Sequence, residues 1–290
     1  MTQVSPIQGS CLCGAVRYEI PGPLKTMLSC HCSICRKHHG SMFATFVSAP
    51  LDGFRWISGE DNITRYQSSD QFDRPFCSTC GSSVATPVPD MGLVFAPAGA
   101  LEGDPGIRPE GHIFAGSKAP WYEITDGLPQ YAEYPESFRK VHAVPGPKRV
   151  PHQDGVVRGS CLCGDIAFEY TGAPSRMMNC HCSRCRHSRG AAHATNIFLN
   201  ADQFRWLKGA DKARRYKVPD AERFAVSFCP RCGGKVPMVS REANFAMVPA
   251  GSLDDAPGME PMAHIFVGSK APWFAITDGR AQFEEYPTTT

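Results

Sequence analysis

The sequence has almost no excess of charge of either sign. Lys and Arg total 30 and Asp and Glu total 28, which gives a formal net charge of +2. Nucleic acids and anionic membranes attract proteins through a strong basic field, and this composition does not build one. The short basic pair Lys148–Arg149 falls in a Pro-rich stretch and is interpreted as solvated charge. We therefore expect no nucleic acid among the partners.

Long apolar runs are absent as well. No run approaches the ~20 residues that a membrane-spanning helix needs. The stretch Met1–Ser10 lacks the apolar core of a signal peptide. We therefore expect a cytoplasmic protein without a membrane partner. In a reducing cytoplasm, closely spaced cysteines are interpreted as metal ligands rather than disulfides.

No long stretch shows helical periodicity. One short helix is predicted, with Ser33 as its N-cap and Gly40 just past its end. Elsewhere, short alternating stretches bounded by turn residues predict strands. These strands are expected at 14–20, 42–47, 54–57, 64–66 and 93–96. The expected fold is mainly β, with short antiparallel strands and little helix.

What the sequence does have is a long internal repeat. The segment Gly9–Gly14 recurs as Gly159–Gly164, and Cys30–Arg36 recurs as Cys180–Arg186 with one substitution, Ile34 to Arg184. The offset is 150 residues in the early part of the repeat and 152 residues in the late part, so the second half carries two extra residues.

A repeat of this length indicates two complete domains rather than solenoid units. We place the first domain at 1–140 and the second at 157–290. A polar, proline-rich linker is expected at 141–156.

The chain has 14 cysteines, and each half has the same three clusters. The pair Cys77 and Cys80 is followed by a glycine and has the shape of a zinc knuckle. A knuckle needs a second pair, and Cys11 with Cys13 supplies one. The sequence therefore predicts a four-thiolate structural zinc. Its counterpart in the second half would use Cys161, Cys163, Cys229 and Cys232.

Three cysteines are left over in each half. They are Cys30, Cys32 and Cys35 in the first half, and Cys180, Cys182 and Cys185 in the second. Three protein ligands with an open fourth position are typical of a catalytic zinc. Two alternatives stay open at this point: a closed site completed by His31 or His112, and a cluster without metal. His112 and its counterpart His264 are interpreted first as strand residues with satisfied hydrogen bonds.

The two halves differ beside these clusters. Lys37-His38-His39 in the first half becomes His187-Ser188-Arg189 in the second, and Met42-Phe43 becomes Ala192-His193. We interpret these differences as a sign that the two sites act on different substrates or that one is inert.

These motifs resemble the glutathione-dependent formaldehyde-activating enzyme (GFA) family. The matching pattern is Gly-Ser-Cys-x-Cys-Gly, Cys-His-Cys-x-x-Cys-Arg, Phe-Cys-x-x-Cys-Gly and a His-Ile-Phe tail, and it covers most of both halves. The resemblance implies two tandem β-tent domains, each with one structural and one catalytic zinc. It assigns the four-cysteine sets to the structural ions and the two three-cysteine clusters to catalysis.

The resemblance also implies an activity. Family members condense glutathione with formaldehyde to S-hydroxymethylglutathione, so we expect the chain to be a carbon–sulfur lyase with a small thiol and an aldehyde as partners. Two alternatives remain. One is the same chemistry on another thiol or aldehyde. The other is a non-catalytic zinc-binding interaction module, since the centromere protein V group and a zinc-bearing accessory factor of small GTPases have similar domains. Family members are usually single-domain, and this chain is doubled.

Overall fold

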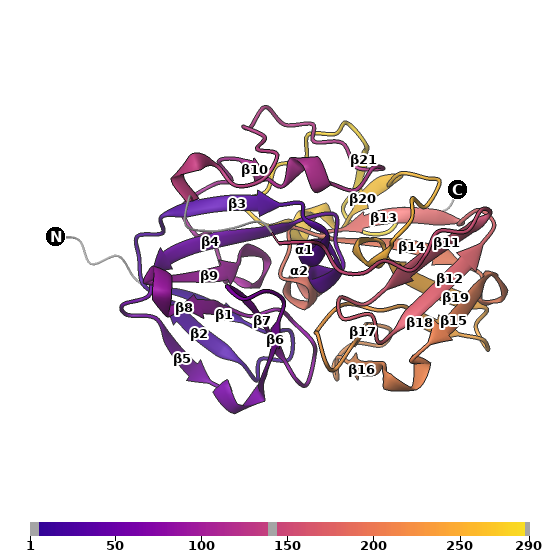
Figure 1. The fold of residues 1–290 in the computed structure, drawn as a ribbon, viewed down its shortest axis with the longest axis horizontal. Helices are drawn as coiled ribbons and strands as arrows, with labels where there is room; N and C mark the ends of the chain where they lie inside the picture. Colours follow the sequence, from indigo (N-terminus) through magenta and orange to yellow (C-terminus); the bar gives the residue numbers. More distant parts are fainter. Residues whose placement is uncertain (1–5, 139–143, 288–290) are drawn as a thin grey trace.

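The computed structural model describes residues 6–138 and 144–287. Residues 1–5, 139–143 and 288–290, which include the first part of the predicted linker, lie outside the described residues. The chain is built mainly of short strands, as the sequence predicts, and two short helices lie near its centre (Figure 1). None of the helices in the described part is long and apolar enough to cross a bilayer.

In the first half, helix α1 (Ser33–His39) follows the third strand. The strands are β1 (Ile7–Ser10), β2 (Arg17–Ile20), β3 (Thr26–Cys30), β4 (Ala44–Pro50), β5 (Arg55–Ser58), β6 (Ile63–Gln67), β7 (Asp73–Cys77), β8 (Thr86–Val88), β9 (Leu93–Pro97) and β10 (His112–Ile113).

The second half repeats this order, with helix α2 (Ser183–Arg189) after its third strand. Its strands are β11 (Val156–Ser160), β12 (Ala167–Thr171), β13 (Arg176–Cys180), β14 (Ala194–Leu199), β15 (Phe204–Lys208), β16 (Arg214–Lys217), β17 (Ala225–Phe228), β18 (Met238–Ser240), β19 (Phe245–Pro249), β20 (Ala263–Ile265) and β21 (Ala281–Phe283).

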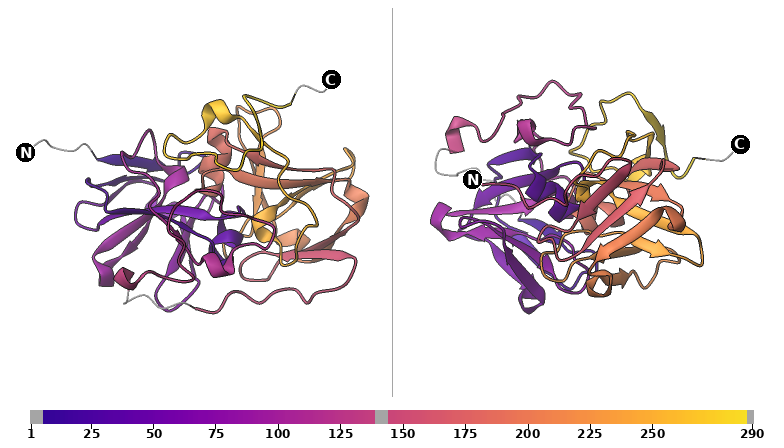
Figure 2. Two further views of the ribbon diagram at one scale, coloured as in Figure 1. Left: turned by 90° about the horizontal axis from the view of Figure 1, so that it is seen from above. Right: turned by 45° about the vertical axis from the view of Figure 1, so that its right-hand side comes forward.

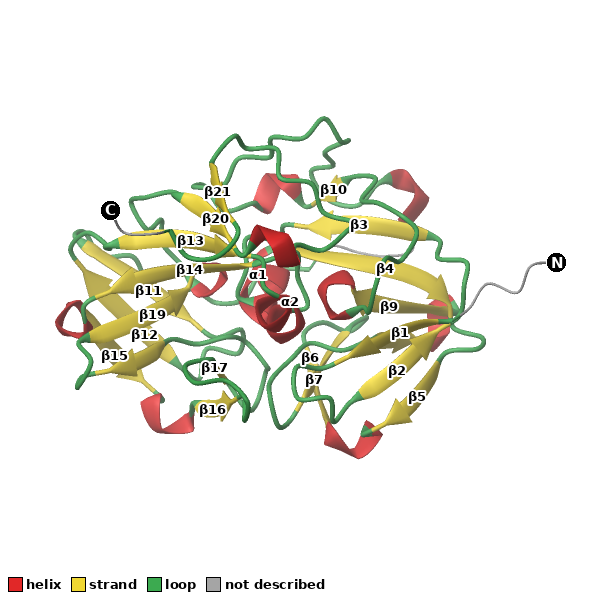
Figure 3. Cartoon of the chain, turned by 180° about the vertical axis from the view of Figure 1, so that it is seen from behind, coloured by secondary structure: helices red, strands yellow, loops and turns green. Residues whose placement is uncertain are grey.

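Each described sheet takes its strands from one half only. The first half forms the sheets β1-β2-β5, β10-β3-β4-β9-β8 and β6-β7, and the second half forms β11-β12-β15, β18-β19-β14-β13-β20-β21 and β16-β17. Most pairs are antiparallel, but β10 runs parallel to β3, and β20 runs parallel to both β13 and β21. The two sets of sheets lie on either side of the helices (Figure 3).

The alternation of side chains in β2 decides which of its faces is buried. Val16, Tyr18 and Ile20 are fully buried, while Arg17 is exposed. The strand is shorter than predicted, because Gly14 has a φ of 73° and closes a turn back to Cys11 before the strand begins. A left-handed backbone suits glycine and interrupts a strand.

The two halves pack against each other (Figure 2), and both helices lie near the centre of the molecule (Figure 1). Helix α1 contacts the 3-10 turn Ala250–Ser252 of the second half, and α2 contacts its counterpart Ala98–Ala100. Gly251 makes this approach possible, because a Cβ there would lie 2.4 Å from the carbonyl of Arg36. One continuous hydrophobic core therefore includes residues of both halves.

A buried ion pair joins the halves. Lys37 Nζ lies 2.9 Å from Asp254 Oδ1, and the two side chains are only 3% and 1% exposed. The same ammonium donates to the carbonyl and hydroxyl oxygens of Ser160 at 2.9 and 2.8 Å. Lys235 lies deep in the same contact, where its ammonium donates to the carbonyls of Gly81 and Gly233, and burial lowers its pKa to about 7.

The two histidines next to Lys37 also face the other half. His38 Nδ1 lies 3.1 Å from the carbonyl of Cys232, and His39 Nδ1 lies 2.5 Å from that of Arg189. The Lys37-His38-His39 segment differs from its counterpart because it forms the contact between halves. It does not line the cavity at the cysteines that is described below.

We expect Lys37→Met to lower the free energy of unfolding by about 3–5 kcal/mol, because it leaves the Asp254 carboxylate buried without its cation. Urea unfolding followed by circular dichroism measures this loss. The double variant Lys37→Met with Asp254→Leu should be less unstable than the single variant, because no unpaired charge remains.

The matched control is Arg55→Met, whose guanidinium is 66% exposed and pairs with Glu19 at 2.5 Å. Its loss should cost less than about 1 kcal/mol. Equal costs for Lys37→Met and Arg55→Met would contradict a stabilising role for the buried pair.

Candidate metal centres and the adjoining cavities

The four-cysteine sets are each brought together from distant segments. The sulfurs of Cys11, Cys13, Cys77 and Cys80 all lie within 4.8 Å of one another. Cys11 Sγ is 3.4 Å from Cys13 Sγ, which is 3.7 Å from Cys77 Sγ. A tetrahedral zinc with Zn–S bonds of about 2.3 Å separates its sulfurs by roughly 3.8 Å, so the spacing fits a metal.

The second half reproduces this arrangement. Its set contains Cys161, Cys163, Cys229 and Cys232, with sulfur separations of 3.5 and 3.7 Å. The backbone supports both sets through N–H···S hydrogen bonds: Val16 donates to Cys11, and Ile166 donates to Cys161, each at 3.3 Å. All fourteen cysteines are free.

The three-cysteine clusters form where a strand passes into a helix. Cys30 ends β3, Cys32 precedes α1, and Cys35 lies in the first turn of that helix. Their sulfurs lie within 4.8 Å of one another, as do those of Cys180, Cys182 and Cys185.

The helix cap differs from the sequence prediction. The N-cap of α1 is Cys32 rather than Ser33, because Cys32 Sγ accepts the N–H of Cys35 at 3.4 Å. Gly40 ends the helix with a φ of 65°, as predicted. The thiol takes the place that a hydroxyl or carboxylate usually has in a cap.

One cysteine of each cluster favours the thiolate form. Hydrogen bonds from Cys30 and Cys35 hold the pKa of Cys32 well below its usual range. In the second half, hydrogen bonds from the two neighbouring thiols lower the pKa of Cys182 to about 3. Cys32 and Cys182 are also the half-exposed members of their clusters, whereas the others are buried.

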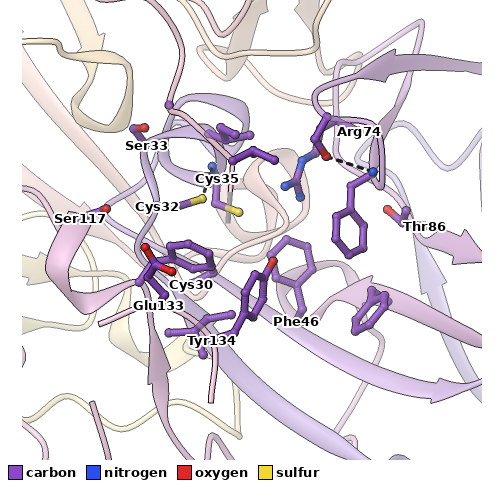
Figure 4. Close-up of a pocket in the computed structure, with 18 residues that line it drawn as sticks. Cys30, Cys32, Ser33, Cys35, Phe46, Arg74, Thr86, Ser117, Glu133 and Tyr134 are labelled. Atoms are coloured by element: carbon purple, nitrogen blue, oxygen red, sulfur yellow. Dashed lines mark hydrogen bonds between the residues drawn. The ribbon is translucent and has the colours of Figure 1, made fainter. Parts of the chain in front are cut away.

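A cavity of about 190 Å³ opens on the first three-cysteine cluster. Aromatic rings of Phe46 and Tyr134 lie on the side facing Cys30, and Arg74 extends from β7 toward Cys32 and Cys35 (Figure 4). These wall residues were not among the candidates expected from the sequence. Tyr134 has a counterpart in Tyr286 and was detectable from the repeat, but Arg74 was not.

The histidines that were candidates for a fourth ligand are bonded to each other instead. His112 Nε2 lies 3.0 Å from both carboxylate oxygens of Asp126, and His112 Nδ1 lies 2.8 Å from His31 Nε2. Among the described residues, no histidine belongs to a cysteine cluster. Because Nε2 of His112 faces a carboxylate it carries the proton, so its Nδ1 accepts from His31. Burial lowers the pKa of His31 to about 3, so its ring is neutral.

The same chain of hydrogen bonds exists in the second half. His264 Nε2 lies 3.0 Å from both oxygens of Asp278, and its Nδ1 lies 2.8 Å from His181 Nε2. His112 and His264 also border a second cavity of about 400 Å³ between the halves. Aromatic residues from both halves line it, including Tyr122.

We expect His112→Leu to cost about 1–3 kcal/mol of stability, because it leaves the buried N–H of His31 without an acceptor. His264→Leu should cost the same within error, since the hydrogen bonds are duplicated. Thermal unfolding of both variants measures the effect. The exposed His152, changed to Leu, is the control and should cost less than about 1 kcal/mol, because its ion pairs with Asp154 and Asp255 are at the surface. No change in the His112 variant would contradict the role of the pair.

Known proteins with similar sequences match the segments that contain the cysteine sets. The family model described as "Glutathione-dependent formaldehyde-activating enzyme" (GFA) matches residues 6–117 and again 156–269. A "Putative glutathione-dependent formaldehyde-activating enzyme" of Halomonas elongata is 32% identical over 149 residues, which are 47% of this chain and 94% of that protein. An "Uncharacterized lyase" of Schizosaccharomyces pombe is 30% identical over 77 residues, or 27% of this chain and 54% of that one.

Among solved structures, a Rhodobacter sphaeroides protein is 29% identical and matches 33% of this chain and 88% of its own, with a TM-score of 0.27. The two segments matched by the family model make up more than half of the chain, and each contains one three-cysteine cluster and one four-cysteine set. The chain therefore belongs to the GFA family, as a member with two tandem domains.

Proposed function

We propose that this protein is a zinc-dependent carbon–sulfur lyase that joins a glutathione-like thiol to formaldehyde. One observation carries the proposal: a cavity opens directly on the three free thiols of Cys30, Cys32 and Cys35. The family and the names of its relatives favour this reaction class.

The cysteines fit zinc in two different ways. Soft thiolate ligands select zinc among the common divalent ions, and four of them complete a structural site. The four-cysteine sets are proposed to be such sites. The three-cysteine clusters supply one protein ligand fewer, which leaves room for an exchangeable ligand.

The reaction needs no oxidant or further reactant. The thiol S–H bond breaks, a C–S bond forms to the carbonyl carbon, and the proton ends on the former carbonyl oxygen. Zinc bound at the cluster supplies Lewis acidity and favours the thiolate form of a ligand thiol. The aromatic wall beside it excludes water and limits how the two reactants meet.

The domain limits and location remain proposals. We place the catalytic units at 1–140 and 157–290, joined by 141–156, each with one structural and one catalytic zinc. A cytoplasmic location would keep the fourteen cysteines reduced and free for metal. We propose no nucleic acid and no membrane as partner.

We expect about four zinc ions per chain, two per half on the ligand counts above. Inductively coupled plasma mass spectrometry on freshly purified protein measures the number of zinc ions per chain. Cys32→Ser should lose one ion and still unfold cooperatively, whereas Cys77→Ser should lose one ion and destabilise its half. A count of two ions, unchanged by Cys32→Ser, would exclude metal from the three-cysteine clusters.

We expect the double variant Cys32→Ser and Cys182→Ser to form S-hydroxymethylglutathione no faster than the uncatalysed reaction. Each single variant should keep the activity of its intact half. NMR exchange spectroscopy on glutathione and formaldehyde measures the rate, with a protein-free sample as control. Full activity in the double variant would exclude the three-cysteine clusters as the reaction sites.

A further inference from the structure

The two three-cysteine sites differ in where they carry positive charge. In the first half, strand pairing places Arg74 opposite Tyr66. In the second half, the same pairing places Val226 opposite Tyr216. The tyrosines correspond in the repeat, so Val226 occupies the position of Arg74. Val226 is 5% exposed and carries no charge.

Arg74 has unused hydrogen-bonding capacity in the cavity. Its Nε donates to Ser68 Oγ at 3.1 Å, and it forms no ion pair with a carboxylate in the part of the chain that the structure describes. Its guanidinium lines the cavity and points toward Cys32 and Cys35 (Figure 4). The terminal N–H groups of an arginine form a planar fork that matches a carboxylate.

The electrostatic setting keeps this residue charged. Burial acts to lower the pKa of Arg74, but the thiolates of Cys35, Cys32 and Cys30 act in the opposite direction and raise it overall. A positive group therefore lies on the cavity wall beside the position where the substrate sulfur would bind.

The second half has other cations near its cluster. Arg184 is exposed and takes the place of Ile34, whereas another is buried. Arg189 of α2 is 4% exposed, and its Nη2 donates to Asn196 Oδ1 at 3.0 Å. The charges of Cys185 and Cys180 partly offset the burial that lowers its pKa. In the second half the buried Arg189 offsets the thiolate charge without lining a cavity wall. Arg74 differs because its guanidinium lines the cavity, where a ligand can reach it.

We propose that Arg74 forms an anion subsite that binds a carboxylate of the thiol substrate at the first site, and that the second site lacks this subsite. The inference rests on the proposed function for the position of the sulfur. The subsite itself is a property of the cavity wall and is measurable without turnover.

Two ligands with the same sulfur and different charge test it. Glutathione carries free carboxylates, and glutathione diethyl ester has them masked. Calorimetry is done on zinc-loaded Cys182→Ser, which keeps the first cluster intact. We expect glutathione to bind about ten- to a hundredfold more tightly than the diester, as a charge-assisted contact predicts. Arg74→Leu should remove this preference, and Arg74→Lys should restore part of it.

The second half provides the matched gain of function. Cys32→Ser keeps the second cluster and gives the preference between glutathione and its diester at a site without a residue corresponding to Arg74. Adding Val226→Arg should raise the preference for glutathione by about tenfold or less, because the added side chain is not preorganised. Zinc content and melting temperature are measured for every variant, and the gain of preference remains decisive if Arg74→Leu folds poorly.

The outcomes separate the subsite from the lyase reaction. An equal loss of affinity for both ligands in Arg74→Leu would overturn the proposal. It would mean that Arg74 only offsets the negative charge of the cysteine thiolates. An unchanged preference in Arg74→Leu would overturn it as well. A preference that depends on Arg74, without product formation in the wild type, would support the subsite and reject the proposed reaction. Where turnover is seen, Arg74→Leu should raise KM for glutathione and leave kcat within about twofold.

Discussion

The rest of the structure depends on the packing of helix α1 against the second half. The first turn of this helix carries Cys35, and its last turn carries Lys37 to His39, which are buried in the other half. The ion pair of Lys37 and Asp254 therefore holds the same seven-residue helix whose other end shapes a three-cysteine cluster. A change in how the halves meet would reach the cysteines within one turn of helix, so the contact between domains and the sites are physically coupled.

The two halves have the same arrangement of cysteines but differ in the residues around them. Both four-cysteine sets have sulfur separations that suit one ion, and both three-cysteine clusters have the same Cys cap on the helix. The Asp–His–His hydrogen bonds are likewise repeated with the same distances. The differences lie where one half faces the other or where a ligand would enter. Lys235 and Lys37 belong to the first kind, and Arg74 belongs to the second.

Several features were readable from particular residues. Val16, Tyr18 and Ile20 alternate and are buried, and Gly40 ends a helix in the left-handed region, because these preferences are local. Capping by Cys32 was not readable, since serine at position 33 is the better cap former by preference. Here the sulfur is held at the N-cap by the strand that precedes it, and that overrides the local preference.

By itself, the sequence determined the family, the mainly β fold and the sorting of cysteines into sets, because metal coordination ties spacing to geometry. It also suggested that the segment Lys37–His39 would distinguish the two sites. Only the tertiary structure showed that this segment joins the halves. Only the structure also showed that Arg74, distant in sequence from Cys32, lies on the wall of the cavity at the first three-cysteine cluster. Both findings depend on contacts between segments far apart in the chain, and no local pattern records which side chains such contacts bring together.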